Sequence, residues 1–531
     1  MSKLTRTPGA SRSFARILAF SSLFLLTGTT FLISQGGFSK AIDELSVRYG
    51  AGSSSSVPDK FSWDNITPSK DLIWHRCYVE PYECARLIVP LDYSNPNGAK
   101  ATIALTRLPS SLPRDSPEYR GPILVNPGGP GASGVEMALS YGKLLSTIVG
   151  PQFDILGFDP RGIGRSTPRV SFFETKVERQ LWGGQNGLGV LNTSYDGLGR
   201  AYARARIVAL WSTNLVDADK ALDTFFKFCH AAGPSDCAFY APTPDLISAN
   251  LTKIYESVSA RPIPVRTPTS YGLVDYNRVR MAVFTALYQP FRLWPTLAQG
   301  LAALAKGNGE LLFAILDRPA FECSCDEGAV RDYPPDNDAS IAVSCNDGDA
   351  VSESFEELEK YFEATTRESQ WAEIWSGIRA SCVGWPVRKN RFRGPFEANT
   401  SFPLLFIGNT ADPVTPISAA KKTAKGFPSA VVLTQDSPGH CSLSSPSICT
   451  QTYIRDYFDK GTLPPPGTVC PIIGTPFPTS VGLDASGQLS TDQVVFGNDS
   501  EGAIAALSVE ERALYDAVKS LSVSDVLPRM L

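Results

Sequence analysis

Residues 430–442 read AVVLTQDSPGHCS, an apolar run followed by a turn that carries His440 between Gly439 and Cys441. The chain has 3 histidines in 531 residues, and this one is a candidate catalytic base. A short apolar strand that leads into a glycine-containing loop is typical of a buried strand in a parallel sheet. In open α/β sheets the chemistry lies at the carboxyl ends of the strands, which is where this loop stands.

Three other stretches repeat this arrangement. Apolar runs at 122–126, 153–159 and 403–408 lead into the loops NPGGPGAS (126–133), PRGIGRS (160–166) and NTADPVTP (409–416). Upstream, residues 85–108 alternate as two strands around an Asn-Pro-Asn-Gly turn. Residues 216–395 differ, because their aromatic and aliphatic side chains recur at helical spacing. The sequence therefore predicts an α/β fold with a mostly parallel sheet and an inserted helical cap. Near the C-terminus, a capping box at Ser508–Glu511 predicts the start of a helix.

The N-terminus has the layout of an export signal. Four basic residues precede an uncharged run of 18 residues at 17–34, which fits either a signal peptide or an uncleaved signal anchor. The serine-rich stretch that follows is typical of a flexible linker. We predict a signal or anchor at 1–37, a stalk at 38–60, an α/β core formed by 61–215 and 396–531, and the cap at 216–395.

Other features agree with a secreted or membrane-anchored protein whose folded part lies outside the cell or in the lumen. The 11 cysteines include the close pairs Cys77/Cys84, Cys229/Cys237 and Cys441/Cys449, which suggest disulfides, and the odd total leaves one cysteine unpaired. No paired CxxC or HExxH pattern indicates a metal site. The net charge of -4 argues against a nucleic-acid partner. Five triplets predict N-glycosylation, at Asn65, Asn192, Asn250, Asn399 and Asn498.

Three loops carry the candidate chemistry. Gly128 and Gly129 follow a strand and let backbone N–H groups approach a ligand oxygen, as in an oxyanion hole. Asp412 and His440 each follow their own strand, in the Asp-before-His order of α/β-hydrolases. The carboxylate would hold the imidazole tautomer and stabilise its charged form. A turn-forming role for Asp412, before Pro413, is the plainer alternative.

The four motifs NPGGPGASG, GFDPRGIGRSTP, LLFIGNTADPVTP and DSPGHCS together resemble the tripeptidyl-aminopeptidase-like α/β-hydrolases, which are related to prolyl aminopeptidases. The resemblance runs from about residue 70 to residue 475. It implies an α/β-hydrolase fold in which Asp412 and His440 are the catalytic acid and base and Gly128 and Gly129 belong to the oxyanion loop. It also implies release of short peptides from free N-termini, with no cofactor, and a peptide or a small ester as substrate.

The serine that this mechanism needs is missing. Such a serine stands on a strand–turn–helix elbow, usually G-x-S-x-G, and that pattern occurs nowhere in the chain. Two partial matches, at Ser140 and Ser270, lack a strand that leads into a helix, and prolines break the approach to Ser270. Four serines between Arg165 and the cap lack the glycine frame: Ser166, Ser171, Ser194 and Ser212.

The resemblance places the loss near Val208. Residues 198–207 resemble the helix before the family's elbow strand, and residues 210–228 resemble the start of its cap. A strand–helix elbow unit and a further strand lie between them in the family, which needs about 30 residues or more. We therefore expect two buried sheet edges with unpaired backbone groups, a chain without activity, and a twelfth cysteine in the lost segment. A gene-model error, a splice form and a real deletion all fit this pattern.

Two other functions stay open. The alternatives to an aminopeptidase are an esterase-like hydrolase on the same fold and a non-catalytic binding glycoprotein. Recognition of a free amine requires carboxylates on the cap that face the cleft, and the cap offers several: Asp217, Asp219, Glu322 and Glu327.

Overall fold

The computed structural model describes residues 61–175, 178, 212–268, 270–316, 337–347, 351, 354–374, 382–386, 394–477, 480–483, 489–495, 502 and 504–524. The chain divides into two units, Met1–Phe61 and Ser62–Leu531, and every element named below belongs to the second. The predicted signal segment and stalk lie outside the described residues. Among the residues that are described, no helix is both long and apolar enough to cross a membrane.

The first sheet is built from the N-terminal part of this unit. Its order is β1-β2-β3-β5-β4, with parallel pairing only between β5 and β4 and antiparallel pairing elsewhere. The predicted hairpin at 85–108 is the β2–β3 pair. The strands are β1 (His75–Arg76), β2 (Glu83–Pro90), β3 (Lys100–Leu108), β4 (Gly121–Val125) and β5 (Phe153–Phe158).

The second sheet is entirely parallel and has the order β10-β9-β8. Its strands are β8 (Leu405–Ala411), β9 (Val431–Pro438) and β10 (Val469–Pro471). The prediction of an α/β fold is confirmed, and the pairs β4–β5 and β8–β9 are parallel as expected. The expectation of a mostly parallel sheet is wrong for the first sheet, because β2 and β3 form a hairpin and β3 runs against β5.

The described strands do not form one continuous sheet. Strand β4 ends the first sheet and β8 ends the second, and within the described residues neither has a neighbour on its outer side. The prediction of two unpaired edges created by a loss near Val208 stays a prediction, because Val208 lies outside the described residues. The expectation that these edges are buried is wrong for β4, whose Leu124 side chain is 60% exposed.

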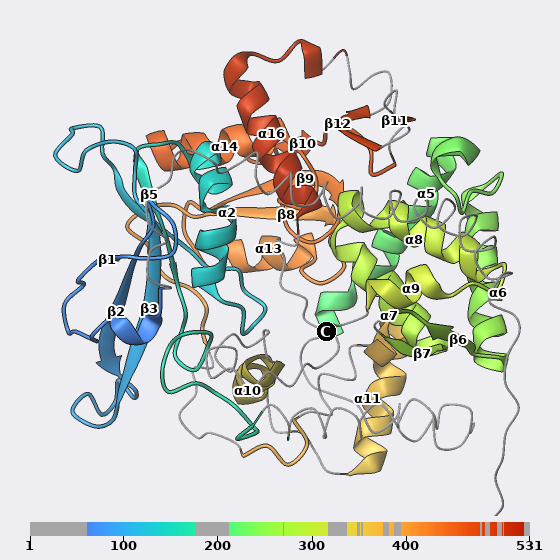
Figure 1. Ribbon diagram of the computed structural model, residues 1–531, viewed down its shortest axis with the longest axis horizontal. Coiled ribbons are helices and arrows are strands. Elements are labelled where there is room, and N and C mark those ends of the chain that lie inside the picture. The colour runs from blue at the N-terminus through green and yellow to red at the C-terminus, as the bar shows by residue number, and fades with distance from the viewer. Residues whose placement is uncertain are drawn as a thin grey trace, which may run out of the picture. The chain divides into compact units, whose positions relative to one another are not determined.

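Helices join the two sheets on one side (Figure 1). Helix α2 (Gly134–Val149) packs on β3 and β5 and also against α14 (Ile448–Lys460) and α16 (Val509–Val523). It approaches β5 closely because glycines face each other: a Cβ on Gly157 would stand 1.9 Å from the carbonyl oxygen of Gly134. The capping box predicted for the late helix is present at the start of α16, at Ser508 and Glu511. Helix α13 (Ile417–Ala424) packs on β8 and β9.

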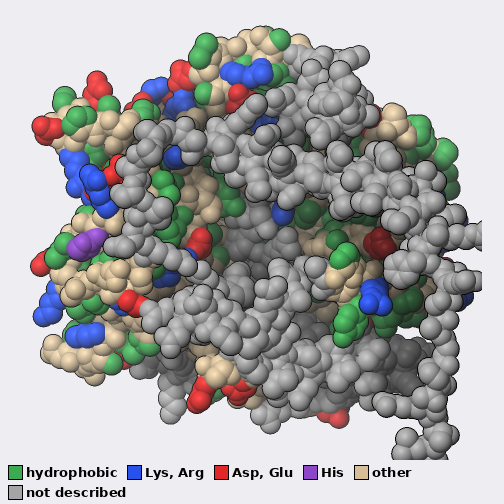
Figure 2. Space-filling view, viewed as in Figure 1, with side chains coloured by type: hydrophobic (Ala, Val, Ile, Leu, Met, Phe, Trp, Pro, Cys, Tyr) green, Lys and Arg blue, Asp and Glu red, His purple; other side chains and the backbone are tan. Residues whose placement is uncertain are grey.

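The cap region is mainly helical and shares a hydrophobic core with the second sheet. Ala411 and Val414, beside β8, belong to the same buried cluster as the cap residues Phe225, Trp294 and Trp371. Figure 2 shows Lys and Arg side chains among exposed hydrophobic ones on the described surface of the first sheet, at the left of this face. The helices are α5 (Ala218–Asp236), α6 (Pro244–Ala260), α7 (Tyr276–Tyr288), α8 (Pro290–Leu304), α9 (Glu310–Ile315), α10 (Asn337–Asp347) and α11 (Phe355–Glu368).

The cap also contains a hairpin at a place where the prolines before Ser270 predict no strand. Strands β6 (Ile263–Arg266) and β7 (Tyr271–Val274) pair antiparallel, and Pro264 pairs with Leu273. A two-stranded ribbon leaves one edge of each strand open, so a proline without an N–H group is tolerated there. A strand therefore does lead toward Ser270. It enters a hairpin turn and not a helix.

The remaining described elements are a second hairpin and two short 3-10 helices. The hairpin is β11 (Ser480–Leu483) with β12 (Leu489–Val495), and the 3-10 helices are at Trp63–Asn65 and Ser212–Leu215.

Four disulfides cross-link the described part of the chain. The predicted pairs Cys77–Cys84 and Cys229–Cys237 are confirmed, and a third disulfide joins Cys345 on α10 to Cys382. The pairing of Cys441 with Cys449 is wrong, since Cys449 at the start of α14 bonds Cys470 on β10 and leaves Cys441 as a free thiol. Helix α14 directs Cys449 toward the adjacent strand, where Cys470 is fully buried.

Candidate active site

Two neighbouring strands bring Asp412 and His440 together. Strands β8 and β9 run parallel, with Ala411 opposite Pro438 in their register. Asp412 follows β8 directly, and His440 stands two residues beyond the end of β9. Because parallel strands end at the same edge of a sheet, two residues far apart in sequence become neighbours.

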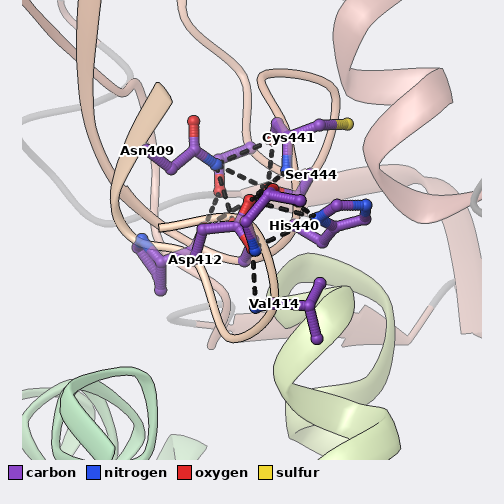
Figure 3. Close-up of polar contacts among 10 residues, drawn as sticks. Asn409, Asp412, Val414, His440, Cys441 and Ser444 are labelled. Carbon is purple, nitrogen blue, oxygen red and sulfur yellow. Dashed lines mark hydrogen bonds and ion pairs between the residues drawn. The ribbon is translucent and has the colours of Figure 1, made fainter. Parts of the chain in front are cut away.

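The two side chains form an ion-pair geometry (Figure 3). The Nδ1 atom of His440 lies 3.1 Å from each carboxylate oxygen of Asp412. Asp412 is buried, whereas the His440 side chain keeps 20% of its surface exposed. A proton on Nδ1 that is donated to the carboxylate leaves Nε2 without a proton, which is the state of a general base.

The Asp412 carboxylate is held by its own loop. One oxygen accepts hydrogen bonds from the backbone N–H groups of Val414 and Thr415, at 2.9 and 2.8 Å. The other accepts from the Thr415 hydroxyl at 2.7 Å and from the Cys441 N–H at 2.9 Å. Burial alone raises the pKa of Asp412, but the adjacent imidazole and these hydrogen bonds outweigh it, so the pKa lies below its ordinary value. Asp412 therefore stays ionised beside the histidine.

Asn409, near the end of β8, fixes the loop that carries the histidine. Its side-chain N–H donates to the carbonyl oxygens of Gly439 and Cys441, at 2.8 and 2.7 Å, and to the Ser444 hydroxyl at 3.2 Å. Asn409 is completely buried, so these bonds are shielded from water. Gly439 has a φ of 97°, a conformation that favours glycine. The sequence around His440 thus forms a turn that is tied to the neighbouring strand.

The corner between cap helices α7 and α8 clamps the same loop. The His440 N–H donates to the Tyr288 carbonyl oxygen at 2.9 Å, and the two rings meet edge to face with centroids 5.4 Å apart. A Cβ on Gly439 would stand 2.6 Å from Pro290. Burial, and then the charge of Asp412, raise the pKa of the Tyr288 hydroxyl. The cap therefore contributes to the orientation of His440 as well as covering the core.

The predicted oxyanion loop follows β4. Gly128 and Gly129 have φ values of 81° and 115°, so both positions favour glycine. The Gly128 N–H donates to the Asn126 side chain at 2.9 Å, whereas no described residue accepts from the Gly129 N–H. Cap helix α10 covers the loop, because the Ser340 hydroxyl donates to the Pro130 carbonyl oxygen. Of the two amides, that of Gly129 is the available donor.

None of the candidate serines that the structure describes is bonded to His440. Ser166 is buried and hydrogen-bonds the backbone of Ala104 and Asp159, and Ser140 is exposed on helix α2. Ser171 donates to the carbonyl oxygen of Phe173, while Ser270 lies in the β6–β7 turn. Ser194 lies outside the described residues, and of Ser212 only the backbone is described. Within the described part of the chain, the imidazole therefore has a carboxylate partner and no serine partner.

The cap carboxylates are placed only in part. Asp217 is the N-cap of α5 and lies near Lys220 and Asp412. Burial raises the pKa of Asp217, Lys220 opposes this, and the Asp412 charge adds to it. Asp219 accepts from the Gln370 N–H at 3.3 Å. Glu322 and Glu327 lie outside the described residues. Among the described side chains, no group of three His, Cys, Asp or Glu residues is placed to hold a metal ion.

Sequence reasoning missed the residues that support the pair. Thr415 stands three positions after Asp412 in NTADPVTP, the spacing of a turn in which a carboxylate accepts from nearby backbone N–H groups. That spacing offered a signal for Thr415. Asn409, Tyr288 and Ser340 gave no such signal, because their contacts depend on strand and helix packing across long stretches of sequence.

The predicted glycosylation sites are also placed in part. Asn65 and Asn399 are exposed, and Asn250 is partly exposed on helix α6. Asn192 and Asn498 lie outside the described residues. Glycosylation therefore stays a prediction.

The lowered pKa of Asp412 predicts acid-sensitive stability. The stabilising contribution of the ionised carboxylate is complete above its ordinary pKa of 3.8 and is lost as the pH falls through the lower pKa of the folded state. We expect Asp412→Asn to lower the free energy of unfolding by about 3 kcal/mol at pH 7, and the difference from the parent to shrink below pH 4. Urea unfolding between pH 7 and pH 2.5 measures it. Asp436→Asn, at an exposed neighbouring carboxylate, is the control and should show no such pH trend; a difference that is constant with pH would contradict the prediction.

Cys441 is expected to be an unreactive thiol. Burial, and then the Asp412 charge, raise its pKa to about 12, so it is protonated at neutral pH. We predict that iodoacetamide at pH 8 modifies Cys441 at least about tenfold more slowly in the folded chain than in urea, since the thiolate is the reactive form. Mass spectrometry of the peptide that contains residue 441 measures the rate. Equal rates in both states would show that the thiol is not protected.

A mixed sheet and a parallel sheet flanked by helices, with an Asp–His pair at the ends of parallel strands, are features of an α/β-hydrolase. The family model described as TAP-like protein matches residues 368–470. Serine protease Hip1 of Mycobacterium tuberculosis is 26% identical over 73% of this chain and 87% of its own length. Carboxylesterase B of the same organism is 26% identical over 79% and 92%. Tripeptidyl aminopeptidase of Streptomyces lividans is 32% identical over 18% and 19%. The TAP-like match therefore covers the segment that carries Asp412 and His440, and the long alignments are with proteins named as hydrolytic enzymes.

Both long alignments contain residues of the relative that have no counterpart in this chain. The alignment with serine protease Hip1 has 468 positions, whereas 73% of 531 residues is about 388, so about 80 positions are empty in this chain. The alignment with Carboxylesterase B has 498 positions against about 419 residues, again about 80 empty positions. About 80 residues of each of these two relatives therefore have no counterpart in this chain.

Proposed function

We propose that this chain is an exported serine hydrolase of the tripeptidyl-aminopeptidase type whose present form lacks the nucleophile. The observation that carries the proposal is the Asp412–His440 pair, with Nδ1 at 3.1 Å from both carboxylate oxygens at the ends of adjacent parallel strands. An imidazole held in this way is a general base for a hydroxyl group. Among the described residues β4 and β8 have no outer neighbour, and about 80 alignment positions are empty in this chain. Both observations support the loss of a segment that carried the serine.

In a complete site the chemistry would run as follows. The serine hydroxyl attacks the substrate carbonyl carbon while its proton passes to Nε2 of His440. Asp412 stabilises the resulting imidazolium, and the Gly129 N–H donates to the oxygen that becomes negative. The leaving amine or alcohol takes the proton from Nε2 as its bond to carbon breaks. Water then repeats the sequence and releases the acyl group from the serine.

The substrate class is a peptide with a free N-terminus. Support comes from relatives named serine protease and tripeptidyl aminopeptidase and from the position of Asp217 beside the Asp412 loop, where a carboxylate can attract an ammonium group. An ester is the second candidate, because one relative is named Carboxylesterase B.

A substrate panel separates the two classes in a chain whose missing segment has been restored. We expect cleavage of tripeptide anilides with free N-termini, and a drop of at least about tenfold in kcat/KM when the same peptides are N-acetylated, because the charged amine is then absent. Short-chain aryl esters are the comparison. Equal cleavage of acetylated and free peptides, with faster cleavage of esters, would favour the esterase.

A fluorophosphonate probe tests for a nucleophile in the chain as it stands. We expect no labelling of the full chain and labelling of the restored chain at the introduced serine, since the probe requires an activated hydroxyl. Chain denatured before probe addition is the background control. A restored, folded chain that stays unlabelled would favour a non-catalytic binding protein.

A further inference from the structure

Polar contacts hold the His440 ring at one atom, Nδ1. This atom lies 3.1 Å from both carboxylate oxygens of Asp412 and 3.1 Å from the Thr415 hydroxyl oxygen. Among the described residues, none forms a hydrogen bond with Nε2. The torsion about the Cβ–Cγ bond of a histidine is broad and roughly two-fold, so a half-turn of the ring has little intrinsic cost. A half-turn carries Nδ1 away from Asp412, so the contact depends on what packs against the ring.

Tyr288, the last residue of α7, packs against this ring from the cap. The two rings meet edge to face, with centroids 5.4 Å apart and planes at 69°. The Tyr288 carbonyl oxygen accepts the His440 N–H at 2.9 Å, which fixes the backbone from which the imidazole turns. One cap residue therefore contacts both the backbone and the ring of His440.

Buried side chains on the same face of α7 support Tyr288 from behind. Phe284 meets Tyr288 edge to face at 5.8 Å and packs on Trp371 at 5.1 Å. The Arg280 guanidinium lies over the Trp371 ring at 3.9 Å. Positions four residues apart lie on one face of a helix, so Arg280, Phe284 and Tyr288 form a continuous row. Phe284 and Trp371 are fully buried, so Tyr288 is close-packed on the side away from His440.

The corner that follows Tyr288 is fixed as well. Gln289 is buried, and its side-chain N–H donates to the Ser524 carbonyl oxygen, after the end of α16, at 2.9 Å. Its side-chain oxygen accepts a hydrogen bond from Arg292 at 2.8 Å. These bonds tie the turn between α7 and α8 to two other elements, so Tyr288 keeps its place beside the His440 loop.

The Tyr288 hydroxyl is not the group that holds the histidine. It is buried and bonds none of the described residues. Burial raises its pKa, so it carries no charge at neutral pH. The contacts with His440 come from the aromatic ring and the backbone carbonyl, and both are retained in a phenylalanine.

We propose that Tyr288 is a positioning residue for His440, because its ring blocks the half-turn that would separate Nδ1 from Asp412. The proton then stays on Nδ1, where the carboxylate accepts it, and Nε2 stays without a proton and can act as the base. The role of His440 as a base rests on the proposed function. The position of its ring does not.

The test follows the Nδ1 proton of His440 by NMR in the full chain. The chain has 3 histidines, so isotope-labelled histidine gives few ring signals, and His440→Gln assigns them. The Nδ1 proton exchanges with water when the ring leaves the carboxylate, so its exchange rate reports how often the ring turns. We expect Tyr288→Leu to raise this rate at least about fivefold, the scale of an aromatic pair, and to move part of the proton to Nε2.

Two further variants at the same position make the test specific. Tyr288→Phe keeps the ring and the carbonyl, so its exchange rate should stay within about twofold of the parent. Tyr288→Met fills the space without a ring and should behave as Tyr288→Leu does, which provides a second test if the leucine variant does not fold.

The matched control is Tyr240→Leu. Tyr240 is also a cap tyrosine that packs on a histidine, since its ring stacks on that of His230 at 5.9 Å. This variant should change the signals of His230 and leave the exchange rate at His440 unchanged. An unchanged rate in both Tyr288→Leu and Tyr288→Met would overturn the proposal. So would an equal rise in Tyr288→Phe or in Tyr240→Leu.

The NMR result does not depend on a nucleophile, so it is separate from the test of the proposed function. In a chain whose missing segment has been restored, Tyr288→Leu should lower kcat about fivefold and change KM less than about twofold. A restored chain without activity would contradict the proposed function and leave the NMR result standing. A restored, active chain in which Tyr288→Leu changes only KM would contradict the positioning role.

Discussion

Restoring the missing segment within the chain is expected to raise serine-dependent hydrolysis by a factor on the order of 10⁶, because that is the scale of rate lost when a triad serine is removed. The insertion point is near Val208, where the two halves of the family pattern meet in this sequence. The inserted residues would supply the nucleophile and two strands for the edges of β4 and β8. Steady-state hydrolysis of a tripeptide anilide measures the change against the unmodified chain.

The control for this experiment is the same insertion with its serine changed to Ala. It has the same strands and helix, so it should fold as the active form does while its rate stays at the level of the unmodified chain. The comparison therefore separates the rate gained from the serine hydroxyl from any rate gained because the added strands complete the sheet. Serine-dependent cleavage by the unmodified chain would contradict the proposal that its nucleophile is absent.

The strands and the Asp–His pair were predictable because the signals are local. Each apolar run from Pro122 to Asn126, Phe153 to Asp159 and Ala430 to Thr434 coincides with a strand of the structure. Once β8 and β9 are recognised as consecutive parallel strands, their ends must lie together, and Asp412 and His440 follow. The sequence predicted this part of the site from two short motifs.

The errors arose where long-range packing decides between local options. Cys441 is close in sequence to Cys449, yet helix α14 directs Cys449 toward Cys470 on β10. The prolines around Ser270 indicated an irregular loop, but a two-stranded ribbon accommodates Pro264 at an open edge. The antiparallel pairing of β3 with β5 likewise depends on strands separated by a helix. Sequence distance does not encode these pairings.

Within the restored chain, Asp412→Asn is expected to lower kcat by about 10⁴ and to leave KM nearly unchanged, as expected for the loss of a triad aspartate. The Asp412 carboxylate lies 3.1 Å from Nδ1 of His440 and accepts four further hydrogen bonds from its loop and from Cys441. An amide can present its NH₂ group to Nδ1 and so favour the tautomer whose proton is on Nε2. That tautomer cannot accept the proton of the serine.

Asp436→Asn is the matched control, because Asp436 is an exposed carboxylate on β9 that bonds the Thr410 hydroxyl at 2.8 Å and lies four residues before His440. Its removal changes the local charge equally and should lower kcat less than about twofold, a change of a few tenths of a kcal/mol. The difference between the two variants isolates the contact with Nδ1 from the general loss of negative charge. Of these two carboxylates only that of Asp412 contacts Nδ1 of His440. Equal losses of kcat from both variants would therefore show that Asp412 acts through its negative charge and does not orient the imidazole.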